Sequence, residues 1–170
     1  VHIETRISVL FSDFYGGISS QASLRELRSL LLKLRALVLS SVSTLFVSLM
    51  ITATMAILLS FVFMQEMGLR PMYMSILRVA SWAMAFHTSA MFCFVFLLYF
   101  DLRKPALLVV SVFCVTNAVL TILLLPLGPL FYGYGIMIAG AITFLLSFAM
   151  LLHEMPWLHY HAFITNNSSL

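Results

Sequence analysis

The stretch "LLYFDLRKPALL", residues 97–108, places three charged residues and a proline between two apolar runs. In the whole chain, 62% of residues are hydrophobic and only 9% are charged. Soluble domains carry about 25% charged residues, so this chain lacks the polar side chains needed to cover its apolar ones. Asp101, Arg103 and Lys104 therefore mark a boundary between membrane and water. The stretch predicts a short loop that joins two membrane-spanning helices.

The remaining charges divide the chain into runs that are long enough to cross a bilayer. Residues 36–64 and 79–100 are uncharged, and residues 105–152 leave room for two crossings. The stretch "PLGP", residues 126–129, divides this last run because two prolines and a glycine break a helix. A transmembrane helix needs about 20 apolar residues, and continuous apolar runs do not match the alternation of a β-barrel. We therefore predict an all-α integral membrane region over residues 36–152, with spans at about 38–63, 73–100, 106–126 and 131–152.

Most positive residues in the connections lie in alternate ones, since the first connection offers only Arg70 against Glu66, and this distribution sets the predicted orientation. Four of them stand shortly before the first span, between residues 25 and 35: Arg25, Arg28, Lys33 and Arg35. Arg103 and Lys104 follow the second span, and the connection after the third span has no charge. Cytoplasmic loops carry the excess of lysine and arginine. We therefore expect the N-terminal segment and the tail, residues 153–170, on the cytoplasmic side, with Lys33, Arg35, Arg103 and Lys104 as the residues that determine topology.

Residues 1–35 are predicted to form a cytoplasmic segment that ends in an amphipathic helix. In "SLRELRSLLLKLR", residues 23–35, Ser23 and Glu26 have the spacing of a capping box. Leucines recur at helical spacing, and the basic residues lie mostly off that face. Such a helix lies on the membrane surface and leads into the first span. Its basic side chains either hold anionic headgroups or a partner, or simply form a solvated positive face. Residue 1 is Val, so we expect the chain to be the C-terminal part of something longer.

Polar groups at membrane depth are the candidates for a transport path. His87 lies within the second span and Asn117 within the third. Ser48 and Thr52 belong to a ridge of small residues at every fourth position from Ser40 to Ser60. In the functional interpretation these side chains contact the transported molecule as neutral hydrogen-bonding groups. In the alternative interpretation they only pack helices together.

The sequence offers no catalytic residues, no metal site and no cofactor motif. The tail stretch "HEMPWLHYH", residues 153–161, is not HExxH, because Trp157 takes the place of the second histidine. All 6 acidic residues lie outside the predicted spans, and no Ser-His-Asp or phosphate-loop pattern is present. No long basic run suggests nucleic acid binding. We therefore predict that the chain is not an enzyme.

Several stretches resemble those of one family in their order and spacing. They are "VHIETRISVLFSDFYGGI", "ASLRELRSLLLKL", "LLYFDLRKPALLVV", "NAVLT" and "LGPLFYGYGIMIAGAITFLL". Together they resemble the C-terminal part of the Pel exopolysaccharide transporter family (PelG), inner-membrane proteins similar to polysaccharide flippases. The resemblance covers nearly all 170 residues. It implies that the chain is the C-terminal part of a flippase-like helical bundle with about a dozen spans.

The resemblance also implies a function. It implies export of an amino-sugar-rich biofilm polysaccharide across the bacterial inner membrane. The implied partners are a cytosolic glycosyltransferase and membrane proteins of a Pel-type synthase complex, one of which senses cyclic di-GMP. Two alternatives stay open: a small membrane anchor or structural subunit, and, less favoured, an intramembrane transferase. The transferase would need carboxylates or a histidine pair facing one cavity, and the predicted spans contain no carboxylate.

Overall fold

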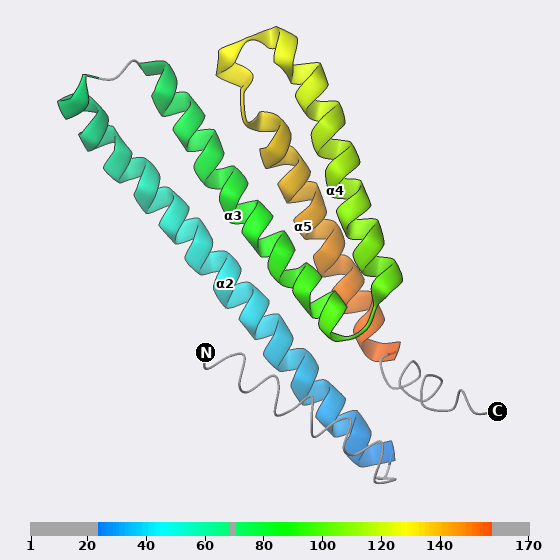
Figure 1. The fold of residues 1–170 in the computed structure, drawn as a ribbon. Coiled ribbons are helices and arrows are strands. Elements are labelled where there is room, and N and C mark those ends of the chain that lie inside the picture. The colour runs from blue at the N-terminus through cyan, green and yellow to red at the C-terminus, as the bar shows by residue number, and fades with distance from the viewer. Residues whose placement is uncertain (1–23, 69–70, 158–170) are drawn as a thin grey trace. The chain divides into compact units, whose positions relative to one another are not determined.

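A computed structural model describes residues 24–68 and 71–157, and within these ranges the chain forms helices and short connections, with no strand. The α-helices are α2 (Leu24–Met67), α3 (Pro71–Tyr99), α4 (Arg103–Leu124) and α5 (Tyr134–Glu154) (Figure 1). Three short 3-10 helices complete the described part: η1 (Leu125–Leu127), η2 (Pro129–Phe131) and η3 (Met155–Trp157). The predicted all-α class is confirmed.

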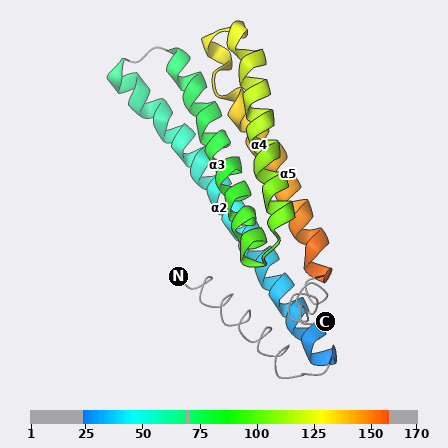
Figure 2. The ribbon, with the colours of Figure 1, turned by 45° about the vertical axis from the view of Figure 1, so that its right-hand side comes forward.

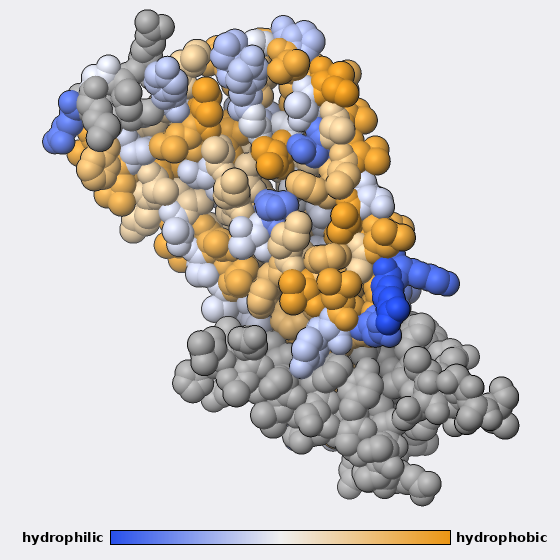
Figure 3. Space-filling model, in the orientation of Figure 1, coloured by the Kyte–Doolittle hydropathy of each residue, from blue (hydrophilic) through white to orange (hydrophobic). Residues whose placement is uncertain are grey.

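Four helical segments are long and apolar enough to cross a membrane, as the charge pattern predicted. They are Ser29–Phe63, Met72–Tyr99, Arg103–Leu127 and Pro129–Glu154. Many of their large apolar side chains are exposed, for example Leu107 at 70% and Ile122 at 71%. Hydrophobic colours accordingly dominate the visible helical surface in Figure 3. An exposed apolar surface of this extent suits lipid or further membrane helices rather than water.

The chain divides into two compact units, and the first contains residues 1–44 and 151–170. Of these, the structure describes residues 24–44 and 151–157. Leu34, Val38 and Val42 are buried and lie four residues apart, so they form one stripe along α2. The predicted surface helix and the first span are continuous in α2, because no glycine or proline interrupts residues 24–67. The predictions for residues 1–23 and for residues 158–170 lie outside the described part.

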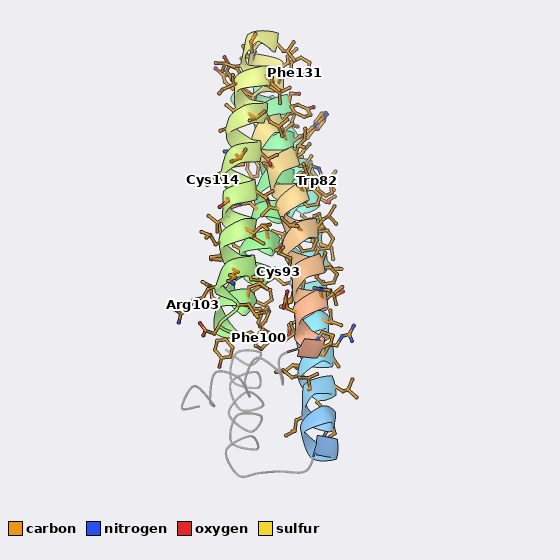
Figure 4. All side chains as sticks on the ribbon, turned by 90° about the vertical axis from the view of Figure 1, so that its right-hand side faces the viewer. Trp82, Cys93, Phe100, Arg103, Cys114 and Phe131 are labelled. Atoms are coloured by element: carbon orange, nitrogen blue, oxygen red, sulfur yellow. The ribbon has the colours of Figure 1, made fainter. Side chains whose placement is uncertain are left out.

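The second unit, Leu45–Met150, contains α3, α4 and the adjoining parts of α2 and α5. Figures 1 and 2 both show α4 running alongside α5. The α3–α4 connection and the η1–η2 turn lie at opposite ends of this unit, as the labelled Arg103 and Phe131 show in Figure 4. Small side chains such as Ala83, Ala90 and Ala139 are buried in this unit, and small residues allow helices to approach closely.

The loop predicted within residues 97–108 is a Schellman motif. The Leu102 N–H donates to the Leu97 carbonyl, and the Asp101 N–H donates to the Leu98 carbonyl, each at 2.9 Å. Asp101 has a φ of 55°, the left-handed conformation that this motif requires. Leu97 and Leu102, the positions at which the motif usually pairs two apolar residues, are both buried. Helix α4 then begins at Arg103 with Pro105 in its first turn, where a missing N–H breaks no helical hydrogen bond.

The predicted break at residues 126–129 is a pair of 3-10 turns. Gly128 separates η1 from η2 with a φ of 94°, a conformation that favours glycine. The Phe131 N–H donates to the Gly128 carbonyl at 3.1 Å, and the Tyr132 N–H donates to the Pro129 carbonyl at 3.2 Å. These bonds reverse the chain within a few residues, so α5 returns beside α4.

Candidate functional site

A groove of about 340 Å³ lies between the C-terminal half of α4, the η1–η2 turn and the first turn of α5. We call it the α4–α5 groove. Asn117 and Thr121 contribute polar groups from α4, four residues apart and therefore on one face of that helix. Phe131 and Tyr132 contribute aromatic rings from the turn, and Figure 4 shows Phe131 at this end of the helices. The remaining lining residues are Leu124, Leu125, Gly133, Gly135 and Ile136.

Asn117, one of the predicted path residues, lies in this groove. Its Oδ1 atom is buried and has no hydrogen-bond partner among the described residues. A buried carbonyl oxygen without a partner is unfavourable by about 1–3 kcal/mol. A donor that reaches this atom, from water or from a bound molecule, would satisfy it.

Glycines bring the first turn of α5 against α4. A Cβ on Gly135 would lie 2.9 Å from the Thr121 hydroxyl oxygen and 3.1 Å from the Thr121 backbone nitrogen. Gly133 has a φ of 91°, and a Cβ there would also meet Val79 at 3.3 Å. The first hydrogen bond of α5 runs from the Met137 N–H to the Gly133 carbonyl at 3.1 Å. The N–H groups in the first turn of a helix have no partner within that helix, and this end of the helix dipole is positive.

His87 lies between helices and does not line the α4–α5 groove. Its ring centroid is 4.8 Å from that of Phe113 on α4, and a Cβ on Gly140 of α5 would lie 3.3 Å from its backbone nitrogen. The His87 Nδ1 and the Thr143 hydroxyl are buried without hydrogen-bond partners in the described residues. The structure thus places the predicted path residues His87 and Asn117 in separate surroundings. A water molecule or a polar substrate group would satisfy the His87 Nδ1, and another would satisfy the Thr143 hydroxyl.

Ser48 and Thr52 are exposed on α2, and their hydroxyls bond to their own helix. Ser48 Oγ donates to the Leu45 carbonyl at 2.9 Å, and Thr52 Oγ1 donates to the Ser48 carbonyl at 2.8 Å. Thr52 also lines a second groove of about 330 Å³, between α2 and α3. Most residues of that groove are apolar or small, among them Ala53, Ala56 and Ala80. Because their donor hydrogens are already used, the ridge hydroxyls offer a ligand mainly acceptor lone pairs.

The residues predicted to determine topology keep their charges at the surface, with one exception. Arg103 Nε contacts Asp101 Oδ1 at 2.7 Å, with 83% and 63% of the two side chains exposed. Lys104 is also exposed. In the first unit, Lys33 is exposed and Arg35 is half-buried. An ion pair this exposed contributes little to stability. The predicted role of Arg103 therefore concerns membrane topology, through its positive charge, rather than the stability of the fold.

Thr121, Tyr132 and Gly135 were not singled out from the sequence as residues of a ligand site. The sequence signal for Tyr132 and Gly135 was the turn "PLGPLFYGYG", residues 126–135, which joins two spans through glycines and aromatics, whereas Thr121 lies before this stretch. In residues 24–68 and 71–157, no group of three His, Cys, Asp or Glu side chains is placed to hold a metal ion. His159 and His161, the other histidines of the tail stretch at residues 153–161, lie outside these ranges.

A family model described as "PelG: Putative exopolysaccharide Exporter (EPS-E)" matches residues 1–163. The chain belongs to the PelG family. The resemblance seen in the quoted stretches is therefore confirmed, and the PelG family is described as a family of exporters rather than of enzymes. Comparison with curated proteins and with solved structures gives no match for this chain.

Proposed function

We propose that this chain is part of a bacterial inner-membrane exporter that moves an amino-sugar-rich exopolysaccharide out of the cytoplasm. The observation that carries the proposal is the PelG family match over residues 1–163, in a chain with four helices long enough to span a membrane. A growing sugar polymer is hydrophilic, so it needs a route lined by groups that replace its hydrogen bonds to water. Asn117, Thr121, His87 and Thr143 are polar groups of this kind within the spans.

The proposed orientation places both ends of the chain in the cytoplasm. Arg103 and Lys104 lie at one end of the second unit, and the uncharged η1–η2 turn lies at the other. Lysine and arginine remain preferentially on the cytoplasmic side. The α4–α5 groove would then face the outer side of the membrane, where an exported polymer leaves.

The proposed partners follow from the direction of transport. A polymer that is exported while it grows must be delivered by a glycosyltransferase at the cytoplasmic side. In the proposed orientation, residues 1–35 and the tail lie on that side and would contact this enzyme and other membrane subunits of a Pel-type synthase. Lys33 is exposed and available for an acidic partner or for anionic lipid headgroups.

Deletion of the encoding gene tests the proposal in a bacterium that secretes a polysaccharide of this class. We expect the deletion strain to retain polymer inside the cell and to lose it from the culture fluid, and we expect the intact gene to restore secretion. If polymer synthesis itself stopped because the glycosyltransferase left the membrane, a structural anchor would be the better function. Normal secretion without the gene would contradict both.

Thiol labelling tests the orientation in intact cells. Single cysteines replace Glu66, Lys104 or Leu130, all exposed, in a background where Cys93 and Cys114 are alanine. A membrane-impermeant maleimide should label positions 66 and 130 but not position 104. Labelling of position 104 alone would reverse the proposed orientation, and permeabilised cells show that every cysteine is reactive.

A further inference from the structure

We infer that the α4–α5 groove binds one uncharged sugar ring of the exported polymer, with Asn117, Thr121 and Tyr132 as its principal contacts. The inference rests on the proposed export function and adds a specific binding site to it. It also defines the chemistry of the unit that is bound. Its basis is the combination of an unpartnered acceptor, exposed aromatic rings and a helix N-terminus in one groove.

The aromatic residues suit the flat faces of a sugar ring. Phe131 and Tyr132 line the groove and are 41% and 45% exposed, so the described residues do not enclose them. A pyranose ring presents C–H groups on its faces and hydroxyls around its edge. Small-molecule pockets commonly combine apolar walls with a few placed polar groups, which is the pattern found here.

The polar residues suit the edge of the same ring. Asn117 Oδ1 is a buried acceptor with no partner in the described residues, so it requires a donor such as a sugar hydroxyl. The Thr121 hydroxyl, one turn further along α4, can both donate and accept. Gly135 and Ile136 belong to the first turn of α5, whose free N–H groups are donors for a hydroxyl or acetyl oxygen.

The electrostatics of the groove favour an uncharged unit over an ammonium-bearing one. The N-terminal end of α5 carries a partial positive charge, which attracts acceptor oxygens and repels cations. None of the groove's lining residues is acidic, so no carboxylate is available to pair with an ammonium group. The volume of about 340 Å³ is near the lower end of the range for ligand pockets, which limits the site to a short segment of the polymer.

Secretion by variants of the full-length protein tests the groove in cells. Thr121→Val removes a hydroxyl and keeps the shape, Asn117→Leu removes the acceptor, and Tyr132→Ala removes a ring. Loss of one hydrogen bond or ring contact should lower secretion about five- to tenfold, with the amount of protein in the membrane unchanged. Leu123→Ala is the matched control, because Leu123 is on α4, is 63% exposed and does not line the groove.

Protection of a thiol measures binding without relying on transport. Leu125→Cys, in the background without the other cysteines, places a thiol in the groove lining. In right-side-out membrane vesicles, N-acetylhexosamine oligosaccharides should slow its reaction with maleimide severalfold, and their de-N-acetylated forms should not. Adding Asn117→Leu should remove the protection.

The two measurements separate failure of this inference from failure of the proposed function. If deletion of the gene abolishes secretion but an Asn117→Leu, Tyr132→Ala double variant secretes normally, export stands and the groove assignment is overturned. If deletion leaves secretion intact, the proposed function fails, and thiol protection still decides whether the groove binds a sugar. Equal labelling rates with and without the acetylated oligosaccharide would reject the site.

Discussion

Thr121 of α4 and Gly135 of α5 are so close that a Cβ on Gly135 would lie 3.1 Å from the Thr121 backbone nitrogen. The Thr121 side chain could rotate away from an added Cβ, but its backbone nitrogen could move only if the helix moved. The pairing of α4 with α5, and with it the shape of the α4–α5 groove, therefore depends on glycine at position 135.

Gly135→Ala should destabilise the helical hairpin formed by α4 and α5. Overpacking of a tight interface typically costs about 1–3 kcal/mol, because the helices must move apart. We expect a lower unfolding temperature of the purified protein in detergent. Gly140→Ala is the graded control, because its nearest backbone neighbour, the His87 nitrogen, would be 3.3 Å away and requires a smaller shift. Equal unfolding temperatures for wild type and Gly135→Ala would show that α4 and α5 tolerate the side chain.

His87→Phe should keep or raise stability while it lowers secretion. The His87 Nδ1 is buried without a hydrogen-bond partner in the described part of the chain, so replacing it with an apolar ring removes a penalty of about 1–3 kcal/mol. The new ring would still pack against Phe113, whose centroid lies 4.8 Å from that of His87. If His87 contacts the polymer, secretion should fall severalfold at an unchanged membrane level.

Thr143→Val on α5 is a second test of the same path, to be compared with His87→Phe. It removes a buried hydroxyl that, like the His87 Nδ1, lacks a partner in the described residues. Reduced secretion by both variants would indicate one polar path between the helices. Normal secretion by His87→Phe, together with normal accumulation, would leave His87 as a packing residue.

The spans were predictable from the sequence because charge and proline positions are local signals. Charged residues at positions 101–104, and prolines with a glycine at positions 126–129, interrupt the apolar runs independently of tertiary contacts. The sequence did not predict that α2 is one continuous helix. The amphipathic pattern of residues 23–35 does not show whether a surface helix continues without a break into the first span. The α4–α5 groove was not predictable, because it depends on how closely the two helices approach each other. The importance of Gly135 becomes visible only when the structure places it against Thr121.

The ridge of small residues shows a second limit of sequence reasoning. The four-residue spacing correctly places Ser48 and Thr52 on one face of a helix. It does not show that both hydroxyls donate to carbonyls of α2 itself. A hydroxyl in a helix often bonds to the preceding turn, so spacing alone cannot distinguish a polar path from a back-bonded ridge.

Asp101→Gly should be tolerated and Asp101→Val should not. Asp101 has a φ of 55°, and the left-handed conformation is unfavourable by roughly 1–2 kcal/mol for a residue with a Cβ, and more so for a β-branched one. Glycine relieves that strain and loses only an exposed ion pair with Arg103. Unfolding temperatures in detergent should rank Gly at or above Asp, and Val below both. A Val variant as stable as wild type would argue against the Schellman geometry of this turn.

Charge reversal at the α3–α4 connection should disturb membrane insertion far more than neutralisation. Replacing Arg103 and Lys104 with Glu removes the positive residues that hold this turn in the cytoplasm and adds two negative charges. Replacing both with Gln removes the same positive charges but adds no negative charge. We expect the Glu variant to accumulate poorly, or to be labelled from outside the cell at a Tyr99→Cys thiol, where the native side chain is 42% exposed. The Gln variant should remain close to wild type, because Lys33 and Arg35 still mark the cytoplasmic side.

The Asp101→Asn variant separates the effect of charge on topology from the ion pair of Asp101 with Arg103. It removes the negative charge from the acceptor of Arg103 Nε, whose distance to Asp101 Oδ1 is 2.7 Å, so at most a neutral hydrogen bond persists, and it leaves both positive residues in place. Asparagine also tolerates the left-handed conformation at this position, so the turn itself should persist. We expect normal insertion, measured as membrane accumulation and as protection from an impermeant maleimide of a thiol at Tyr99→Cys, a position beside the turn that is 42% exposed. If Asp101→Asn were as defective as the Glu variant, the ion pair rather than the positive charge would determine how this hairpin inserts.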